Sequence, residues 1–318
     1  MNRLVLAGGS GFLGTAISKY FAGTADEIVV LTRRPTGQRG VREVCWDGAT
    51  LGPWQQELNG ARAVINLCGR SVNCRYNRRN RQLILDSRIN STRVLGQAIA
   101  QCKQPPQVWL NAGTATIYRH SFDQAMDEAS GTFGAAIEAK DEFSLEVAIA
   151  WERALELCRL PQTRKVALRT AMVLGPGKNS VFPVLRRLVR FGLGGKMGNG
   201  RQFVSWIHQD DLCRAIGWLM QKNDFEGPVN LVAPNPLPNA QMMSTLCRVC
   251  RAPFGLPANY WMLEVGAWLL RTETELILKS RRVVPGKLLA SGFQFNFADF
   301  ESAAIDIERQ IMEAGRLG

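Results

Sequence analysis

The nine residues LAGGSGFLG, positions 6–14, decide the fold class of this 318-residue chain. A short apolar run at 4–7 precedes the glycines, and residues 12–21 have the spacing of an amphipathic helix. A glycine cluster between a buried strand and a helix is the context in which dinucleotide-binding proteins hold a pyrophosphate. A plain flexible turn is the alternative interpretation.

The spacing of the glycines indicates how a phosphate would be held. Gly8 permits a tight turn, Gly11 lets the backbone approach a pyrophosphate, and Gly14 allows the helix to pack closely on the sheet. The start of the helix offers free N–H groups and a partial positive charge. Besides these glycines, the predicted cofactor-binding run includes Ser10, Phe12 and Leu13.

The chain beyond the glycines alternates between two patterns. Apolar runs typical of buried strands lie at 28–31, 63–67, 108–110 and 166–168. Segments with helical spacing lie between them at 87–102 and 151–157. This alternation predicts an α/β fold with a Rossmann-like, doubly wound parallel sheet.

The composition changes after Gly175 and suggests a second, smaller domain. Residues 176–204 are rich in glycine, proline and cations, and we interpret them as an excursion over the cleft. Residues 232–239 resemble a linker, 240–248 and 260–279 have helical patterns, and 293–297 alternate as a strand would. We therefore expect a dinucleotide-binding Rossmann domain at 1–175, to which 205–231 return. A smaller C-terminal α+β domain on the substrate side would comprise 176–204 and 232–318.

The end of the second strand indicates which nicotinamide cofactor is preferred. An acidic residue there usually accepts from the ribose 2′-hydroxyl of NAD, whereas arginine accommodates the 2′-phosphate of NADP. This chain has Thr32, Arg33 and Arg34 and no carboxylate at that point. Guanidinium groups form charge-assisted contacts with phosphate. The residues favour NADP(H), with a solvated loop as the alternative.

Composition and charge indicate which kinds of partner, such as nucleic acid, a membrane, a metal or a small molecule, the chain would bind. The net charge of +12 and the seven arginines between 70 and 93 would suit an acidic partner, but no nucleic-acid-binding signature accompanies them. No apolar run is long enough to span a membrane, and no signal peptide precedes the first strand. We expect a cytoplasmic protein with a small-molecule substrate and eight reduced cysteines. Cys247 and Cys250 lack a second ligand pair, so no metal site is predicted.

Taken together, these segments resemble the extended short-chain dehydrogenase/reductase superfamily, and in particular its atypical "epimerase family" branch with a C-terminal domain of unknown function. Matching segments run almost from end to end: GGSGFLG, TRRP, CWDG, VINLCG, SRINSTRVL, LRTAMVLGPG, FGLGGKMGNGRQFVSWIHQDD, GPVNLVAPNP and RRVVPGKLLASGFQF. The resemblance implies a cofactor lined by Leu67, Cys68 and Gly69 after the third strand. It also places Arg88 near the cofactor phosphate and Val173 near the nicotinamide. A surface position on an amphipathic helix is the alternative for Arg88.

The catalytic residues of the superfamily are partly missing. Its reductases commonly use a tyrosine as acid and base, with a lysine four residues later that lowers the tyrosine pKa. None of the four tyrosines of this chain has a lysine at that spacing. The usual positions fall at or near Phe143 and Val147, neither of which can move a proton. Thr114 matches the superfamily's serine or threonine position, although it could equally cap the end of a strand.

Several other side chains are candidates to replace the missing pair. Tyr118 occupies a position that flanks the cleft in the resembled proteins, and His208 lies in a segment that borders their substrate pocket. A structural role for His208, bonded within its loop before a helix starting at Leu212, is the alternative. Glu146 and Glu152 lie near the lost pair, and His120 is expected to be solvated. Arg201 and Gln202, in the basic excursion, are the predicted substrate contacts; the other cations that could clamp an anion there are Arg186, Arg187, Arg190 and Lys196.

Two classes of function remain open from the sequence. The first is an NADP(H)-dependent oxidoreductase or epimerase-like enzyme acting on a small molecule. The second is a non-catalytic NADP(H)-binding sensor or partner-binding protein that kept the cofactor and lost the acid/base pair. Fold alone does not choose between them.

Overall fold

The computed structural model describes residues 2–269 and 273–316. Within them, seven strands form one fully parallel sheet in the order β10-β6-β5-β4-β1-β2-β3. Their bounds are β1 Arg3–Ala7, β2 Glu27–Thr32, β3 Arg42–Cys45, β4 Ala63–Asn66, β5 Val108–Thr114, β6 Arg164–Thr170 and β10 Gly227–Leu231. The predicted doubly wound α/β fold is confirmed.

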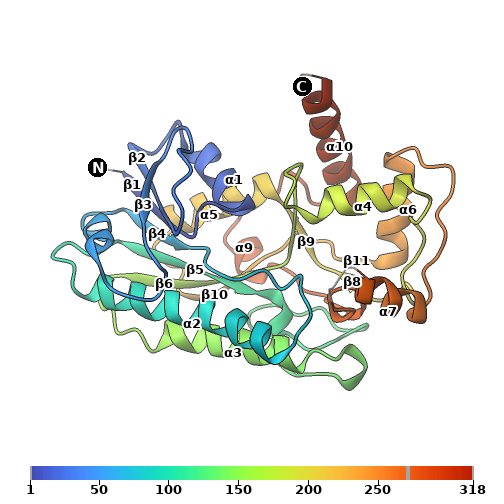
Figure 1. The fold of residues 1–318 in the computed structure, drawn as a ribbon, viewed down its shortest axis with the longest axis horizontal. Coiled ribbons are helices and arrows are strands. Elements are labelled where there is room, and N and C mark those ends of the chain that lie inside the picture. The colour runs from blue at the N-terminus through green and yellow to red at the C-terminus, as the bar shows by residue number, and fades with distance from the viewer. Residues whose placement is uncertain (1, 270–272, 317–318) are drawn as a thin grey trace.

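Both faces of this sheet are covered, which explains why its strands are continuous apolar runs. Leu4 and Leu6 of β1 pack toward the helices α1 and α5, whereas Val5 and Ala7 pack toward α2. Figure 1 shows α1 and α5 on one face and α2 and α3 on the other. The helices are α1 Phe12–Phe21, α2 Arg78–Ala100, α3 Glu142–Glu156 and α5 Gln209–Gln221.

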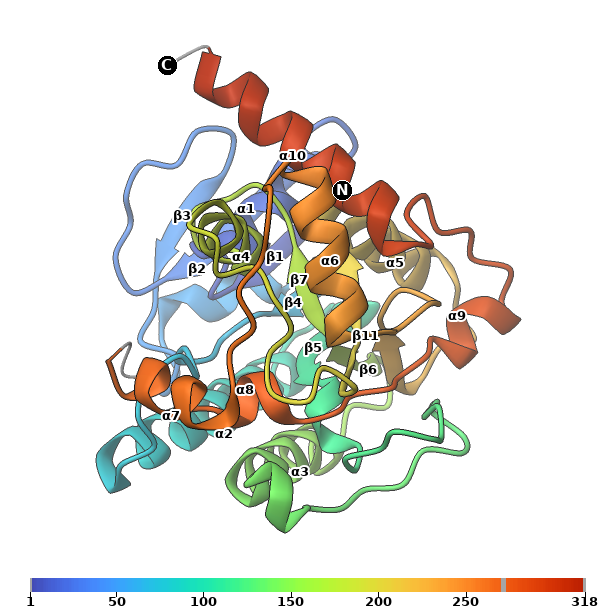
Figure 2. The ribbon, with the colours of Figure 1, turned by 90° about the vertical axis from the view of Figure 1, so that its right-hand side faces the viewer.

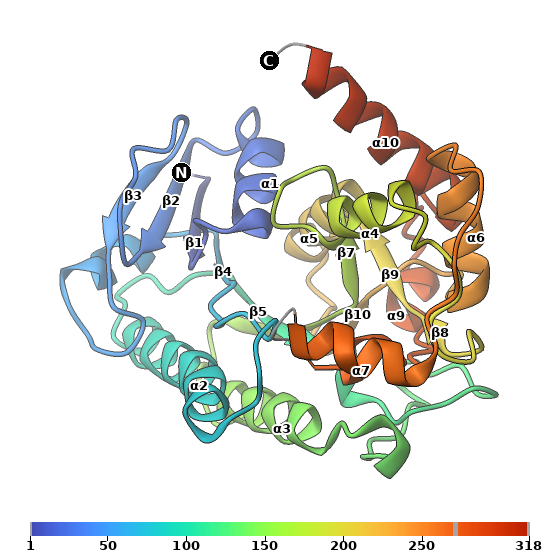
Figure 3. The same cartoon turned by 45° about the vertical axis from the view of Figure 1, so that its right-hand side comes forward.

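The remaining elements build a second cluster beside the carboxyl edge of the sheet. They are α4 Val181–Arg190, α6 Asn239–Val249, α7 Tyr260–Leu269, α8 Glu275–Leu278 and α10 Phe300–Arg316, with the short strands β7 Met172–Leu174, β8 Phe203–Val204, β9 Trp206–His208 and β11 Leu237–Pro238. Helix α9, Gly286–Ala290, packs instead against the main sheet. An apolar core formed mainly by α4, α6 and α10 holds this cluster together. Figures 2 and 3 show these three helices side by side, with α7 nearer the start of α2.

Several boundaries differ from the sequence predictions. Residues 293–297 form no strand, because Phe293 enters the main core and packs edge-on against Phe295. Strands β3 and β10, at the two edges of the sheet, were not predicted. Helix α5 begins at Gln209 rather than Leu212, and part of the helical pattern at 260–279 lies outside the described residues. In the described residues, no helix is long and apolar enough to cross a membrane.

The chain therefore returns to the first domain near its C-terminal end. Leu288 of α9 and Phe293 are buried in the same core as β1 and α5. Asp211, which is completely buried, fixes this return by accepting hydrogen bonds from the backbone N–H groups of Asn296 at 2.9 Å and Phe297 at 2.8 Å. The predicted domain boundary at 232 consequently separates segments that share one core.

We predict that Asp211→Asn lowers the free energy of unfolding by about 2 kcal/mol, because an amide offers one acceptor oxygen where the carboxylate offers two. Urea unfolding followed by circular dichroism measures the change. Asp210→Asn is the matched control, since the neighbouring Asp210 carboxylate is half exposed. An equal effect of both substitutions would contradict the structural role of Asp211.

Candidate functional site

The turn between β1 and α1 has the geometry of a phosphate-binding loop. Gly8 adopts a φ of +71°, a region that favours glycine. The helix α1 has no side-chain cap and no acidic residue in its first turn, so its first N–H groups are available to an anion. A Cβ added at Gly11 would meet nothing within 4 Å, which leaves open space beside the helix start. These features fit a dinucleotide pyrophosphate.

Gly14 is closest to the glycine loop. A Cβ at this position would lie 2.0 Å from the carbonyl oxygen of Gly9. The structure thus adds a close approach between α1 and the glycine loop to the role that the sequence suggested. Gly14 holds the loop against the helix whose N-terminus faces the proposed phosphate.

Arg33 and Arg34 follow β2 at the same edge of the sheet, and both are exposed. Thr32 is buried, and its carbonyl oxygen accepts a hydrogen bond from Trp46 at 3.1 Å, which fixes the end of the strand. The Arg33 guanidinium lies close enough to the Cys68 thiol to favour its charged form. This arginine thus lies near both the β2 end and the loop that follows β4.

The loop after β4 comprises Leu67, Cys68 and Gly69. The buried Asn66 holds it, because its side chain accepts a hydrogen bond from the Cys68 N–H at 3.1 Å and donates one to Asn111 at 2.7 Å. Burial raises the pKa of the Cys68 thiol to about 12, so this cysteine is a thiol and not a nucleophile at neutral pH. Sequence reasoning did not identify the two asparagines.

Arg88 lies beside this loop rather than on an open surface. One of its nitrogens donates to the carbonyl oxygens of Arg70 at 3.1 Å and Ile84 at 2.9 Å, and its guanidinium lies over the Trp151 ring. No carboxylate pairs with it among the described residues, and burial lowers its pKa to about 10. A Cβ on Gly69 would lie 3.2 Å from the guanidinium carbon, so this cation adjoins the predicted cofactor loop.

The segment that contains Val173 also reaches the glycine loop. Val173 lies in β7, and a Cβ on Gly175 would come within 2.9 Å of the Phe12 ring at the start of α1. The loop after β7 therefore covers the N-terminal end of α1. The structure brings the segments after β1, β4 and β6 to one edge of the sheet, as a doubly wound fold requires.

Thr114 ends β5, and its hydroxyl oxygen accepts a hydrogen bond from the Thr116 N–H at 3.1 Å. The threonine is half buried and caps a single turn of 3₁₀ helix, whereas the alternative interpretation had it cap the end of a strand. Phe143 and Val147 are buried among apolar side chains that include Ile84. The positions of the missing tyrosine and lysine are thus part of a packed interface between α2 and α3.

Tyr118 points into the protein. The residue is 1% exposed, and its hydroxyl donates to Asn230 at 2.9 Å while accepting from Arg169 at 2.8 Å. Arg169 in turn forms a two-point ion pair with Glu152. Burial raises the pKa of Tyr118. Its hydroxyl and the Glu152 carboxylate are both engaged in this internal network.

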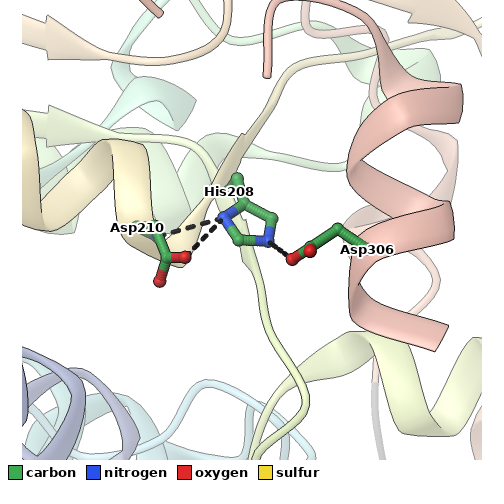
Figure 4. A group of neighbouring side chains, drawn as sticks. All are labelled: His208, Asp210 and Asp306. Carbon is green, nitrogen blue, oxygen red and sulfur yellow. Dashed lines mark hydrogen bonds and ion pairs between the residues drawn. The ribbon is translucent and has the colours of Figure 1, made fainter. Parts of the chain in front are cut away.

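His208 is fully buried and joins two helices. Its Nδ1 accepts the Asp210 N–H at 3.1 Å at the start of α5, and its Nε2 faces the Asp306 carboxylate of α10 at 3.4 Å (Figure 4). A neutral ring that accepts at Nδ1 carries its proton on Nε2, so neither nitrogen has a lone pair left for a metal. Burial lowers the pKa of this histidine. The role is structural, but it differs from the predicted alternative, because His208 itself caps α5 and its ring also faces α10.

His120 is half buried rather than solvated, since its Nδ1 accepts a hydrogen bond from the Ser280 N–H at 3.0 Å. It thereby binds the C-terminal segment to the loop after β5.

The predicted substrate contacts lie apart from the glycine loop. Arg201 lines a hollow of about 380 Å³ together with Lys196, Asn199 and Phe122. Gln202 is buried, and its side-chain amide donates to the Met197 carbonyl at 2.9 Å. Elsewhere in the basic excursion, Arg186 and Arg190 both pair with Glu308 of α10 and are not free to clamp a substrate.

Residues 4–232 match the NAD dependent epimerase/dehydratase family, and residues 260–307 match a domain of unknown function, DUF1731. The chain belongs to this epimerase/dehydratase family. It is 31% identical to epimerase family protein YfhF of Bacillus subtilis over 95% of this chain and 96% of that protein. It is 30% identical to epimerase family protein SDR39U1 of Mus musculus over 96% of this chain and 99% of that one. The crystal structure of human SDR39U1 with NADPH is similar at a TM-score of 0.81 and 28% identity, over 96% of this chain and 98% of that chain.

We predict that alanine at two glycines of the family's loop has very different effects on thermal stability. Gly14→Ala should lower the melting temperature markedly and abolish dinucleotide binding, because its Cβ would overlap the Gly9 carbonyl. Gly11→Ala should leave the melting temperature nearly unchanged and weaken binding, since its methyl group enters only the open space beside α1. Thermal unfolding and calorimetric titration with NADPH measure both effects. Equal stability of the two variants would contradict this account of the loop.

We also predict that stability falls as the pH decreases through about 6.5, the ordinary histidine pKa. Burial lowers the His208 pKa in the folded state. As the pH decreases, His208 is therefore protonated in the unfolded chain before it is protonated in the folded protein, and this lowers the free energy of unfolding. In His208→Asn, which retains a capping side chain, the decrease between pH 7 and 5.5 should be shallower. His120→Asn, at the half-buried histidine, should reduce the slope less. Urea unfolding at each pH tests both variants.

Proposed function

We propose that this protein is an NADP(H)-dependent oxidoreductase or epimerase-like enzyme that acts on a small molecule with a carbonyl or hydroxyl group. The observation that carries the preference for NADP(H) is the pair of exposed arginines, Arg33 and Arg34, directly after β2. No carboxylate follows this strand to accept from a ribose 2′-hydroxyl, and two guanidinium groups suit a 2′-phosphate. The NADPH in the human SDR39U1 structure supports the same preference.

Different residues of the chain would contact different parts of the cofactor. The N–H groups at the start of α1 would hold the pyrophosphate, the loop of Leu67, Cys68 and Gly69 would line the cofactor, and Arg88 would lie near the cofactor phosphate. Val173 would border the nicotinamide, and Thr114 would orient a substrate oxygen. When bound, the cofactor supplies or accepts a hydride, and the protein positions the substrate and holds the proton that accompanies the transfer.

A non-catalytic NADP(H)-binding protein is the second candidate. The observation that favours it is the burial of Phe143 and Val147 in an apolar interface at the positions of the usual tyrosine and lysine. Oxidation of NADPH in the presence of a panel of aldehydes and ketones separates the two functions. Turnover with any of them supports the enzyme.

We predict that the purified, cofactor-free protein binds NADPH at least about tenfold more tightly than NADH, equivalent to about 1.4 kcal/mol. Arg33→Ala/Arg34→Ala should abolish this preference by weakening the binding of NADPH and leaving that of NADH nearly unchanged. Isothermal titration calorimetry with both cofactors measures the four affinities.

Arg153→Ala/Arg159→Ala is the matched control. It removes the same charge from exposed positions at the end of α3 and in the loop that leads to the amino edge of β6. This control should retain the preference for NADPH. If the wild-type protein binds NADH as tightly as NADPH, the assignment of the 2′-phosphate to the two arginines is wrong.

A further inference from the structure

A polar cluster lies next to the positions where the superfamily's tyrosine and lysine are missing. The Tyr76 ring, from the loop before α2, packs edge-on against Phe143 with 5.0 Å between the ring centroids. Ser144, the next residue of α3, lies close to both the Tyr76 hydroxyl and the Glu275 carboxyl group, and it favours the charged form of each. Three segments far apart in the sequence therefore place a phenol, a hydroxyl and a carboxyl group together.

Glu275 is the unusual member of this cluster. It begins α8 in the C-terminal segment and is only 3% exposed. Among the described residues, no hydrogen bond of regular geometry reaches either of its carboxylate oxygens, and the buried Tyr76 hydroxyl also lacks one. A buried carboxylate in such surroundings is costly, so the group favours its neutral, protonated form.

The neighbouring charges do not offset this cost. Lys279 is fully buried, but its ammonium group pairs with Asp141 and donates to the Thr116 carbonyl at 2.6 Å. The Arg281 guanidinium donates to the Thr116 hydroxyl at 3.2 Å. Both cations favour the carboxylate of Glu275, whereas Asp141 opposes it, and burial dominates. The net result is a raised pKa for Glu275.

The cluster adjoins the proposed cofactor site on two sides. Thr116, which contacts both Lys279 and Arg281, follows the candidate Thr114 by two residues at the carboxyl end of β5. The Arg88 guanidinium adjoins Gly69 in the loop after β4. It is also close enough to Tyr76 for the two side chains to interact electrostatically. In a doubly wound sheet, ligands bind outside the carboxyl ends of the strands. The Glu275 carboxyl group is thus on the side where a substrate would meet the nicotinamide.

Resting on the proposed function, we infer that Glu275 replaces the missing tyrosine and lysine as the proton donor to a carbonyl oxygen of the substrate, with Tyr76 and Ser144 beside it. In the reducing direction, NADPH supplies the hydride to the carbonyl carbon. The O–H bond of the Glu275 carboxyl group breaks, and a new O–H bond forms on the substrate oxygen. The Glu275 carboxylate then recovers a proton from water, and in the oxidising direction it accepts the proton.

A purely structural role predicts a different state for this group. A glutamate that served only to hold the C-terminal segment would be paired with a cation, as Asp141 is with Lys279. A proton donor must instead be protonated at neutral pH and reachable from the cofactor side. Protonation and reachability are both measurable without a known substrate.

The test uses the full-length protein and N,N′-dicyclohexylcarbodiimide, which labels protonated carboxyl groups in apolar surroundings. We expect labelling of Glu275 at pH 7, mapped by mass spectrometry, and a decrease on the order of tenfold when NADPH saturates the protein. Infrared spectroscopy at pH 7 should show the carbonyl band of a protonated carboxylic acid that is absent from Glu275→Gln. Glu264→Gln is the matched control and should keep both signals, because Lys140 holds the pKa of Glu264 below its usual value.

The outcomes distinguish a proton-donating Glu275 from a purely structural one. The absence of the infrared band, labelling that does not occur, or labelling that NADPH does not reduce would overturn the inference, provided that calorimetry shows NADPH bound. A wild-type protein that binds no NADPH would instead overturn the proposed function. At an NADPH concentration that saturates the wild-type protein but not the variant, Arg33→Ala/Arg34→Ala should retain the infrared band and the labelling while losing most of the protection by NADPH, which separates the two sites. Thermal unfolding of Glu275→Gln verifies that the variant is folded.

Discussion

The contact between Gly14 and the Gly9 carbonyl oxygen positions the start of α1 relative to the glycine loop, and the arrangement of the proposed cofactor site depends on it. A side chain at Gly14 would force α1 away from the glycine loop, since its Cβ would lie 2.0 Å from that oxygen. With the loop held in place, the uncapped N-terminus of α1 faces the carboxyl edge of the sheet, where the segments after β2, β4 and β7 also meet. The partial positive charge of the helix and the arginines after β2 then act on the same region.

The C-terminal segment is distant in the sequence but packs against this edge of the sheet. Asp211 at the start of α5 binds the backbone at 296–297, and Lys279 binds the Thr116 carbonyl just after β5. Part of the chain after 232 therefore packs into the core of the Rossmann domain. The C-terminal segment also delivers Glu275 and Lys279 into the junction with the Rossmann sheet. Such a junction between a Rossmann domain and a second segment is a common place for a substrate site.

The absence of the tyrosine–lysine pair has a clear structural consequence. Phe143 and Val147 give α3 an apolar contact with α2 and with the Tyr76 ring, in place of two polar groups that would need solvent or substrate. The polar groups near this contact come instead from the loop before α2, from α3 and from α8. Tyr118, the tyrosine closest in sequence to Thr114, is held in an internal network with Arg169 and Asn230. Sequence proximity was therefore a poor guide to the chemistry here.

The sequence by itself determined the elements whose signals are local. The glycine spacing and the periodicity of residues 12–21 predicted α1 with its observed bounds, and the apolar runs predicted the central strands β1, β2, β4, β5 and β6. Only the tertiary structure decided the edge strands β3 and β10, the burial of Phe293 and the meeting of Tyr76, Ser144 and Glu275. Each of these depends on contacts between residues tens to hundreds of positions apart. Periodicity and spacing report only which face of an element is apolar, and not which distant segment packs against it.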